Sequence, residues 1–293
     1  MRTFESYNPV VITLYYMSAI FLLIFSQNPF LLLIGFSGAI AFFIIRSGQK
    51  NVKSHLVYFF VFLVTALINP ILSHNGNTVL FVINDSAITI EAIAYGIVSA
   101  GIIVTVLYLF QSFTDIMTQD KLLYVFGKIS PKLSLILSIG LRYVPLLKNK
   151  TKKIYKNQKA IGLYKNNINV LDKIKCDLYV FSTLTTWAFE NSITTADSMS
   201  ARGYGNKKRT YYSLFKFGKA DVFILILITL CFVVTMIAMV SGVLDFVFYP
   251  SIMFTDCTPF GMFTYIAYGV LSLIPIFMEV EERIKWRYLK SKI

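Results

Sequence analysis

Six long runs of apolar residues limit the folds open to this 293-residue chain. They lie at residues 10–25, 30–45, 56–73, 92–110, 222–244 and 263–278. A helix needs about 17–25 predominantly apolar residues to cross a bilayer, and the runs approach or reach that length. The mean hydropathy of +0.65 and the 56% share of hydrophobic residues exceed those of ordinary soluble domains. The sequence therefore predicts an all-α polytopic membrane protein with about six transmembrane helices.

The positive charge of the chain is concentrated between its fourth and fifth apolar runs. Residues 113–220 hold 19 Lys/Arg and 6 Asp/Glu, so the whole net charge of +13 belongs to this segment. A seventh apolar run, at 133–147, would place basic clusters on both sides of the membrane if it spanned, against the positive-inside bias. We therefore expect it to be a buried or interfacial helix. Both termini and the 113–220 segment are then expected in the cytoplasm, with the chain in the cell membrane.

About three helices are expected within residues 113–220. The Ser130-Pro131 pair is suited to open the first, because proline favours the first helical position. The second is expected to end near Gly162, before an Asn-rich turn. The third is expected from about 177 to 202, with Gly203 or Gly205 as its C-terminal stop.

Two faces of the second expected helix have different characters. Leu147, Ile154 and Ile161 recur every seven residues and predict an apolar stripe that packs on a neighbour. On another face, basic residues recur at intervals of four, four and three, which suits anionic lipid headgroups. These residues are Lys148, Lys152, Lys156 and Lys159.

The stretch SMSARGYGNKKRT, residues 198–210, separates the third expected helix from the next apolar run. Ala201 and Gly203 leave Arg202 uncrowded at the helix end. Two interpretations of Arg202 stay open: a cation that favours the negative end of the helix dipole, or a guanidinium that pairs with a carboxylate in the groove of a partner. The basic residues 207–209 are expected to contact the membrane surface or a partner.

The sequence lacks the patterns of several functional classes. It has no Gly-x-x-x-x-Gly-Lys-Ser/Thr phosphate loop and no Cys-x-x-Cys pair. His55 and His74, read as solvated loop residues, lie too far apart to share a metal ion. Glu91 and Glu279 are expected at span ends that water reaches, which leaves few ionisable groups for ion-coupled transport. We expect no enzymatic activity, no cofactor, no metal site and no nucleic-acid partner.

Several stretches make the chain resemble the transmembrane T components of energy-coupling factor (ECF) transporters, the ABC-type importers of vitamins and transition-metal ions. The resemblance runs over nearly the whole chain and is most specific in DSMSARGYGNKKRT at 197–210. The other stretches are NP near the amino end, GNTVLFVINDSAITIEAIAYG at 76–96, LRYVP at 141–145 and QKAIG at 158–162.

The resemblance implies a non-catalytic coupling role. Such components hold two cytoplasmic ABC ATPase subunits through two coupling helices, each ending in an Ala-Arg-Gly-like motif. They also bind a separate integral membrane S component that captures the substrate. Closure of the ATPases on ATP would pass through the coupling helices and reorient the S component.

The resemblance also implies which residues dock the ATPases. The second motif is intact as Ala201, Arg202 and Gly203. The first departs from the family pattern, because Gln158, Ala160 and Gly162 fit but Ile161 stands where arginine is expected. Arg142, Pro145 and Gly205 are expected to support the coupling domain.

These inferences divide the chain into three domains. Residues 1–112 form an N-terminal membrane domain with about four spans, 113–220 a cytoplasmic coupling-helix domain, and 221–293 a C-terminal membrane domain with about two spans and a basic tail. The expected function is coupling of ATP hydrolysis to micronutrient uptake; the alternatives are a self-contained secondary transporter and a membrane enzyme. The substrate is not encoded here, because the resemblance assigns specificity to another polypeptide.

Overall fold

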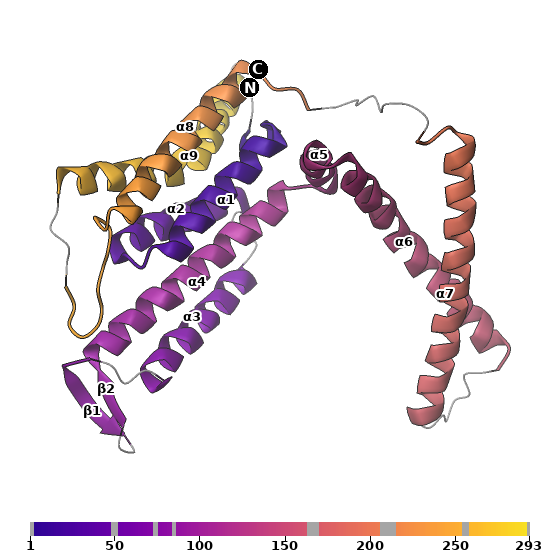
Figure 1. Ribbon diagram of the computed structural model, residues 1–293, viewed down its shortest axis with the longest axis horizontal. Coiled ribbons are helices and arrows are strands. Elements are labelled where there is room, and N and C mark those ends of the chain that lie inside the picture. The colour runs from indigo at the N-terminus through magenta and orange to yellow at the C-terminus, as the bar shows by residue number, and fades with distance from the viewer. Residues whose placement is uncertain are drawn as a thin grey trace. The chain divides into compact units, whose positions relative to one another are not determined.

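The computed structural model describes residues 3–47, 52–72, 76–83, 86–162, 170–205, 215–253 and 258–291. Over these ranges the chain forms nine α-helices, one short 3-10 helix and one β-hairpin (Figure 1). It separates into two compact units. We call Met1–Leu122 with Phe215–Ile293 the membrane unit, and Leu123–Leu214 the central unit.

The membrane unit is built from six apolar helices. Five of them are long and apolar enough to cross a membrane, whereas α1, with 17 residues, is shorter. This confirms an all-α polytopic membrane protein, while the number of spans stays a prediction. The helices are α1 (Pro9–Phe25), α2 (Pro29–Ser47), α3 (Val52–Leu72), α4 (Ile90–Ile116), α8 (Lys219–Val240) and α9 (Pro259–Lys290).

Three of these helices begin at a proline that follows a polar cap residue. In each, the side-chain oxygen of the cap accepts a hydrogen bond from a first-turn backbone N–H at 2.9–3.2 Å. Proline itself lacks the N–H that would otherwise go unpaired there. The pairs are Asn8-Pro9, Asn28-Pro29 and Thr258-Pro259.

The core of the membrane unit forms where α1, α2, α4, α8 and α9 meet, with α3 lying along α4 (Figure 1). Tyr16, Phe43 and Tyr268 are almost completely buried in it. The α3–α4 contact depends on Gly96, because a Cβ there would lie 2.8 Å from the backbone oxygen of Ala66. A side chain at this position would push the two helices apart.

A β-hairpin joins α3 to α4, and the sequence analysis did not predict it. Strand β1 (Val79–Ile83) pairs antiparallel with β2 (Ser86–Thr89). Thr89 also caps α4, since its hydroxyl accepts a hydrogen bond from the Ala92 N–H at 3.3 Å. A strand could have been predicted from residues 79–83, because this β-branched and aromatic run favours strands and is too short to span a bilayer.

Two polar side chains of this unit are less accessible than expected. Glu91 is only 3% exposed, and its carboxylate accepts hydrogen bonds from the backbone N–H and the hydroxyl of Thr78. His55 lies within α3, with Nδ1 2.7 Å from the Tyr108 hydroxyl. The expectations of a water-exposed Glu91 and of a loop His55 are therefore wrong. Glu91 is enclosed beside Thr78, and His55 belongs to a helix and contacts Tyr108 of α4. His74 lies outside the described residues.

The central unit consists of the end of α5 (Gln119–Ile129), α6 (Pro131–Ala160) and α7 (Val170–Ala201). Within this unit, α6 and α7 cross each other (Figure 1). The first two helices expected from the sequence are in fact one, because α6 continues through Pro145. Proline there costs a single backbone hydrogen bond, and its ring is exposed. The third begins at Val170, earlier than expected.

Candidate functional site

The Ala-Arg-Gly motif forms the C-terminal cap of α7. Gly203 has a φ of +77°, and its N–H donates to the Ser200 carbonyl at 2.9 Å. The Tyr204 N–H donates to the Met199 carbonyl at 3.1 Å. This pair of hydrogen bonds is a Schellman motif, in which glycine tolerates the left-handed backbone. Arg202 is therefore the cap residue that precedes the left-handed Gly203, and its side chain is exposed.

The end of α6 shares the left-handed glycine and the first of these two hydrogen bonds. Gly162 has a φ of +84°, and its N–H donates to the Lys159 carbonyl at 3.1 Å. Ile161 is the cap residue, as Arg202 is in α7, and its side chain is 77% exposed. The QKAIG and ARG stretches thus build similarly capped helix ends that present an apolar side chain in one case and a cation in the other.

The exposure of Ile161 corrects the predicted apolar stripe on α6. Ile154 is buried at 8% exposure and Leu147 is half-buried, as expected. Ile161 lies beyond the end of this packing, because the seven-residue repeat does not record where the neighbouring helix stops. Gln158, one turn earlier, is half-buried.

Side-chain contacts fix α6 against α7 near their crossing. The Asn191 amide donates to the Tyr143 hydroxyl at 2.8 Å, and that hydroxyl lies 3.1 Å from the Thr195 hydroxyl. The Lys150 ammonium lies 4.8 Å from the centre of the Trp187 ring, which is a cation–π contact. These contacts join the middle of α6 to α7.

The structure brings together two of the predicted site residues from different helices. Arg142 of α6 and Arg202, directly after α7, line one groove of about 450 Å³. Pro145 and Gly205 do not line it; Gly205 has a φ of +97° with open space around it. The remaining lining residues are Leu135, Ser138, Ile139, Thr194, Thr195, Ser198 and Met199.

A second groove of the central unit gathers most of the predicted lysine face. Lys152, Lys156 and Lys159 line a hollow of about 630 Å³. Its other wall comes from α7 and contains one carboxylate residue, Asp177, beside the apolar Val180, Phe181 and Leu184. Lys148 is exposed but does not line the hollow. The predicted basic residues 207–209 lie outside the described part of the chain.

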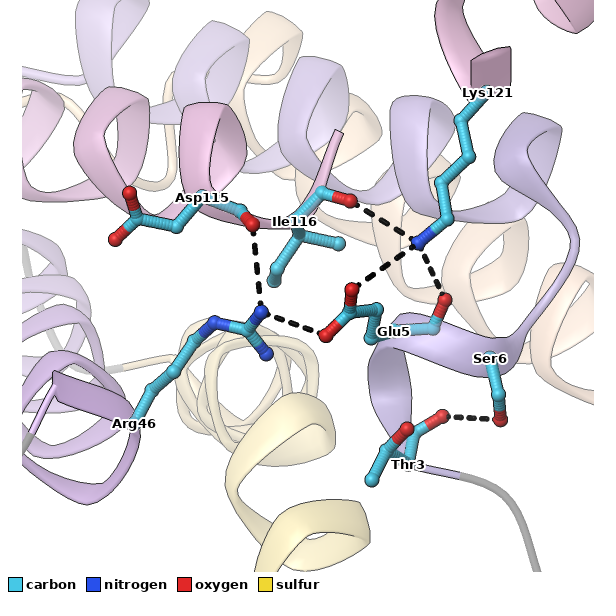
Figure 2. A network of polar contacts seen from close by, with 7 residues as sticks. All are labelled: Thr3, Glu5, Ser6, Arg46, Asp115, Ile116 and Lys121. Atoms are coloured by element: carbon cyan, nitrogen blue, oxygen red, sulfur yellow. Dashed lines mark hydrogen bonds and ion pairs between the residues drawn. The ribbon is translucent and has the colours of Figure 1, made fainter. Parts of the chain in front are cut away.

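A polar cluster in the membrane unit was not found by sequence reasoning (Figure 2). Glu5, in the 3-10 helix η1 (Phe4–Ser6), accepts from the Arg46 guanidinium at 2.7 Å and lies 3.9 Å from the Lys121 ammonium. Lys121 also donates to the backbone oxygens of Glu5 at 2.7 Å and Ile116 at 3.1 Å. Arg46 reaches the backbone oxygen of Asp115 at 3.4 Å. The cluster ties η1 to the ends of α2 and α4 and to the start of α5.

Lys121 is the most enclosed member of this cluster, with 9% of its side chain exposed. Burial lowers the pKa of its amino group; the Glu5 carboxylate opposes this shift and the Arg46 guanidinium adds to it. The ion pair with Glu5 therefore helps to keep Lys121 charged.

The same N-terminal segment also contacts the start of α8. The Asp221 carboxylate, which is fully buried, accepts from the Asn8 N–H at 3.1 Å and from the Gly218 N–H at 2.7 Å. Residues 3–8, which we call the 3–8 segment, thus touch both places where the chain passes between the membrane unit and the central unit. Local sequence motifs could not predict these contacts, since the partners are more than 100 residues apart.

The long apolar helices define a multi-pass membrane protein. Residues 3–212 match the family described as Cobalt transport protein (CbiQ). The match covers more than half of the chain, which therefore belongs to this family.

Curated relatives carry the name energy-coupling factor transporter transmembrane protein EcfT. The protein of Listeria innocua is 40% identical over 96 residues, which are 32% of this chain and 36% of the relative. That of Streptococcus equi is 33% identical over 100 residues, or 34% and 37% of the two chains. That of Staphylococcus aureus is 33% identical over 113 residues, or 38% and 42%. The chain thus matches 36–42% of the length of these relatives.

Proposed function

We propose that this chain is the transmembrane T component of an ECF transporter. In this role it docks two cytoplasmic ATPase subunits through the ends of α6 and α7. It then transmits their ATP-driven motion to a separate substrate-binding membrane subunit for uptake of a vitamin or metal ion. The observation that carries the proposal is the pair of similarly capped helix ends, one of which presents Arg202. The family match and the names of the relatives support it.

The geometry suggests how motion would be transmitted. Each cap fixes the last turn of its helix, so a force on Arg202 or Ile161 acts on the helix axis rather than on a loose tail. The contacts of Tyr143 and Lys150 across the crossing then make α6 and α7 respond together. A guanidinium suits the docking role because it can form two parallel hydrogen bonds with a carboxylate.

The proposal is tested by Arg202→Glu, which reverses the charge at the cap. We expect weaker co-purification of the ATPase subunits and loss of ATP-dependent uptake, with the chain still in the membrane. The matched control is Lys153→Glu, an equal charge change at an exposed position of α6 outside both grooves. Unchanged assembly and uptake in Arg202→Glu would contradict the proposal. Gradient-driven uptake by the chain alone would favour a secondary transporter.

We place both chain ends and the central unit in the cytoplasm, because the basic residues then lie on one side. Impermeant maleimide labelling of single cysteines tests this in a background without the three native cysteines. Val79→Cys, at an exposed hairpin position, should label in intact cells, and Lys153→Cys only in inverted membranes. The reverse pattern would overturn the orientation.

The lysine-lined groove is a proposed contact for anionic lipid. The three lysines outnumber the single carboxylate residue, Asp177, and together with the apolar surface they match a phosphate headgroup and the start of its acyl chain. Thermal stability of the whole chain in nanodiscs measures whether anionic lipid binds. Anionic lipid should stabilise the wild type more than a variant with Lys152, Lys156 and Lys159 changed to Gln; equal stabilisation would refute the contact.

A further inference from the structure

The groove that contains Arg142 and Arg202 has an unusual balance of charge. Its lining includes both guanidinium groups and no Asp or Glu. Neither arginine forms an ion pair with any residue that the structure describes. Two like charges facing one hollow repel each other, and an anion in the hollow would relieve that repulsion.

Hydroxyl groups add neutral donors to the same lining. Ser138 and Ser198 face the groove from opposite helices, and neither hydroxyl donates to a described residue. Thr194 and Thr195 are already engaged, since their hydroxyls donate to backbone oxygens of α7. Two guanidinium groups and two serine hydroxyls are a donor set suited to carboxylate or phosphate oxygens.

The apolar part of the lining favours a carboxylate on a side chain over a free phosphate. Leu135, Ile139 and Met199 contribute surface that an inorganic ion cannot cover. The methylene groups of a glutamate or aspartate and its neighbours can cover it, which adds hydrophobic burial to the charge pairing. The groove also lies at the α7 end, beside the residue that the proposed function assigns to ATPase docking.

We propose that this groove receives an acidic side chain of an ATPase subunit, and that Arg142 is the second arginine that binds it. The inference rests on the proposed function and adds a residue and a ligand class to it. Ile161 leaves the α6 cap position without an arginine, so both arginines of the docking surface serve the α7 end. Docking is then chemically unequal: the α7 end takes an acidic side chain between two arginines, and the α6 end offers an apolar contact.

The test measures binding of purified ATPase subunits to the whole chain in nanodiscs. Arg142→Gln should weaken binding about tenfold, as expected for loss of one charge-assisted pair. Arg142→Lys should recover part of the loss, since it restores the charge but not the planar fork. Lys148→Gln is the matched control, because this exposed cation of α6 lies outside the groove. Thermal unfolding of each variant checks that the fold is retained.

A second readout reports position rather than affinity. A photo-reactive residue in place of Ser138 should crosslink to an ATPase subunit, and one in place of Lys148 should not. Wild-type affinity for Arg142→Gln, with Arg202→Gln weakened, would overturn the groove and leave the proposed function standing. Wild-type affinity for both variants would overturn the docking role itself. If Arg142→Gln instead lost only the stabilisation by anionic lipid, the ligand would be a lipid phosphate and the proposal would be wrong.

Discussion

At the scale of single residues, the docking ends depend on two glycines with left-handed backbone. Gly162 and Gly203 adopt φ values of +84° and +77°, which any other residue adopts only with strain. The glycine after each cap residue therefore sets the direction in which Ile161 or Arg202 leaves its helix. Sequence reasoning found these stops because the preference is local and needs no knowledge of the partner helix.

Gly203→Ala and Gly140→Ala should have opposite effects. Alanine at 203 strains the cap by about 1–2 kcal/mol and misdirects Arg202, so ATPase binding should fall. Gly140 lies inside α6 with open space around it, and alanine there should stabilise the helix by about 0.5–1 kcal/mol. Unfolding midpoints and co-purification check both. Equal behaviour of the two variants would mean that the cap geometry has no role in docking.

At the scale of elements, the sequence predicted the presence of helices better than the residues at which they begin and end. The apolar helices and the helix starts at prolines could be predicted from the sequence, because both depend on composition and on a few local hydrogen bonds. The continuity of α6 through Pro145 could not, because a helix can lose one backbone hydrogen bond at an exposed proline and still continue. Sequence reasoning also could not show that Arg142 and Arg202 line one groove, since this depends on where α6 crosses α7.

The unequal helix ends predict unequal losses on truncation. Ile161→Ala removes only exposed apolar contact area, so ATPase binding should weaken modestly. Arg202→Ala removes a charge-assisted pair and should weaken binding more. Binding of the ATPase subunits to each variant ranks them, and equal losses would contradict the chemical difference between the two ends.

At the scale of the whole molecule, the 3–8 segment holds both connections that leave the membrane unit. Phe4 is fully buried and packs edge-on against Tyr15 and Phe42, with ring centres 5.4 and 6.0 Å away. Glu5 then reaches the start of α5 through Lys121, and Asn8 reaches the start of α8 through Asp221. In the proposed function, this arrangement would give the moving helices a fixed base.

Glu5→Gln should lower the free energy of unfolding of the membrane unit by about 1–2 kcal/mol. The change removes the ion pairs with Arg46 and Lys121 and leaves Lys121 enclosed without a carboxylate. Glu281→Gln is the control, because its ion pair with Lys285 is exposed and should contribute less than about 1 kcal/mol. Denaturant titrations of both variants in detergent measure the difference, and equal losses would show that the cluster adds no stability.

The long reach of the 3–8 segment also bears on the order of biosynthesis. Its residues leave the ribosome before Arg46, Lys121 and Asp221, so its hydrogen bonds are completed only as these partners are made. The contact with Asp221 forms after the whole central unit has been translated. The 3–8 segment is thus made before its partners, and its contacts within the membrane unit are completed only after residues 123–214 have been translated.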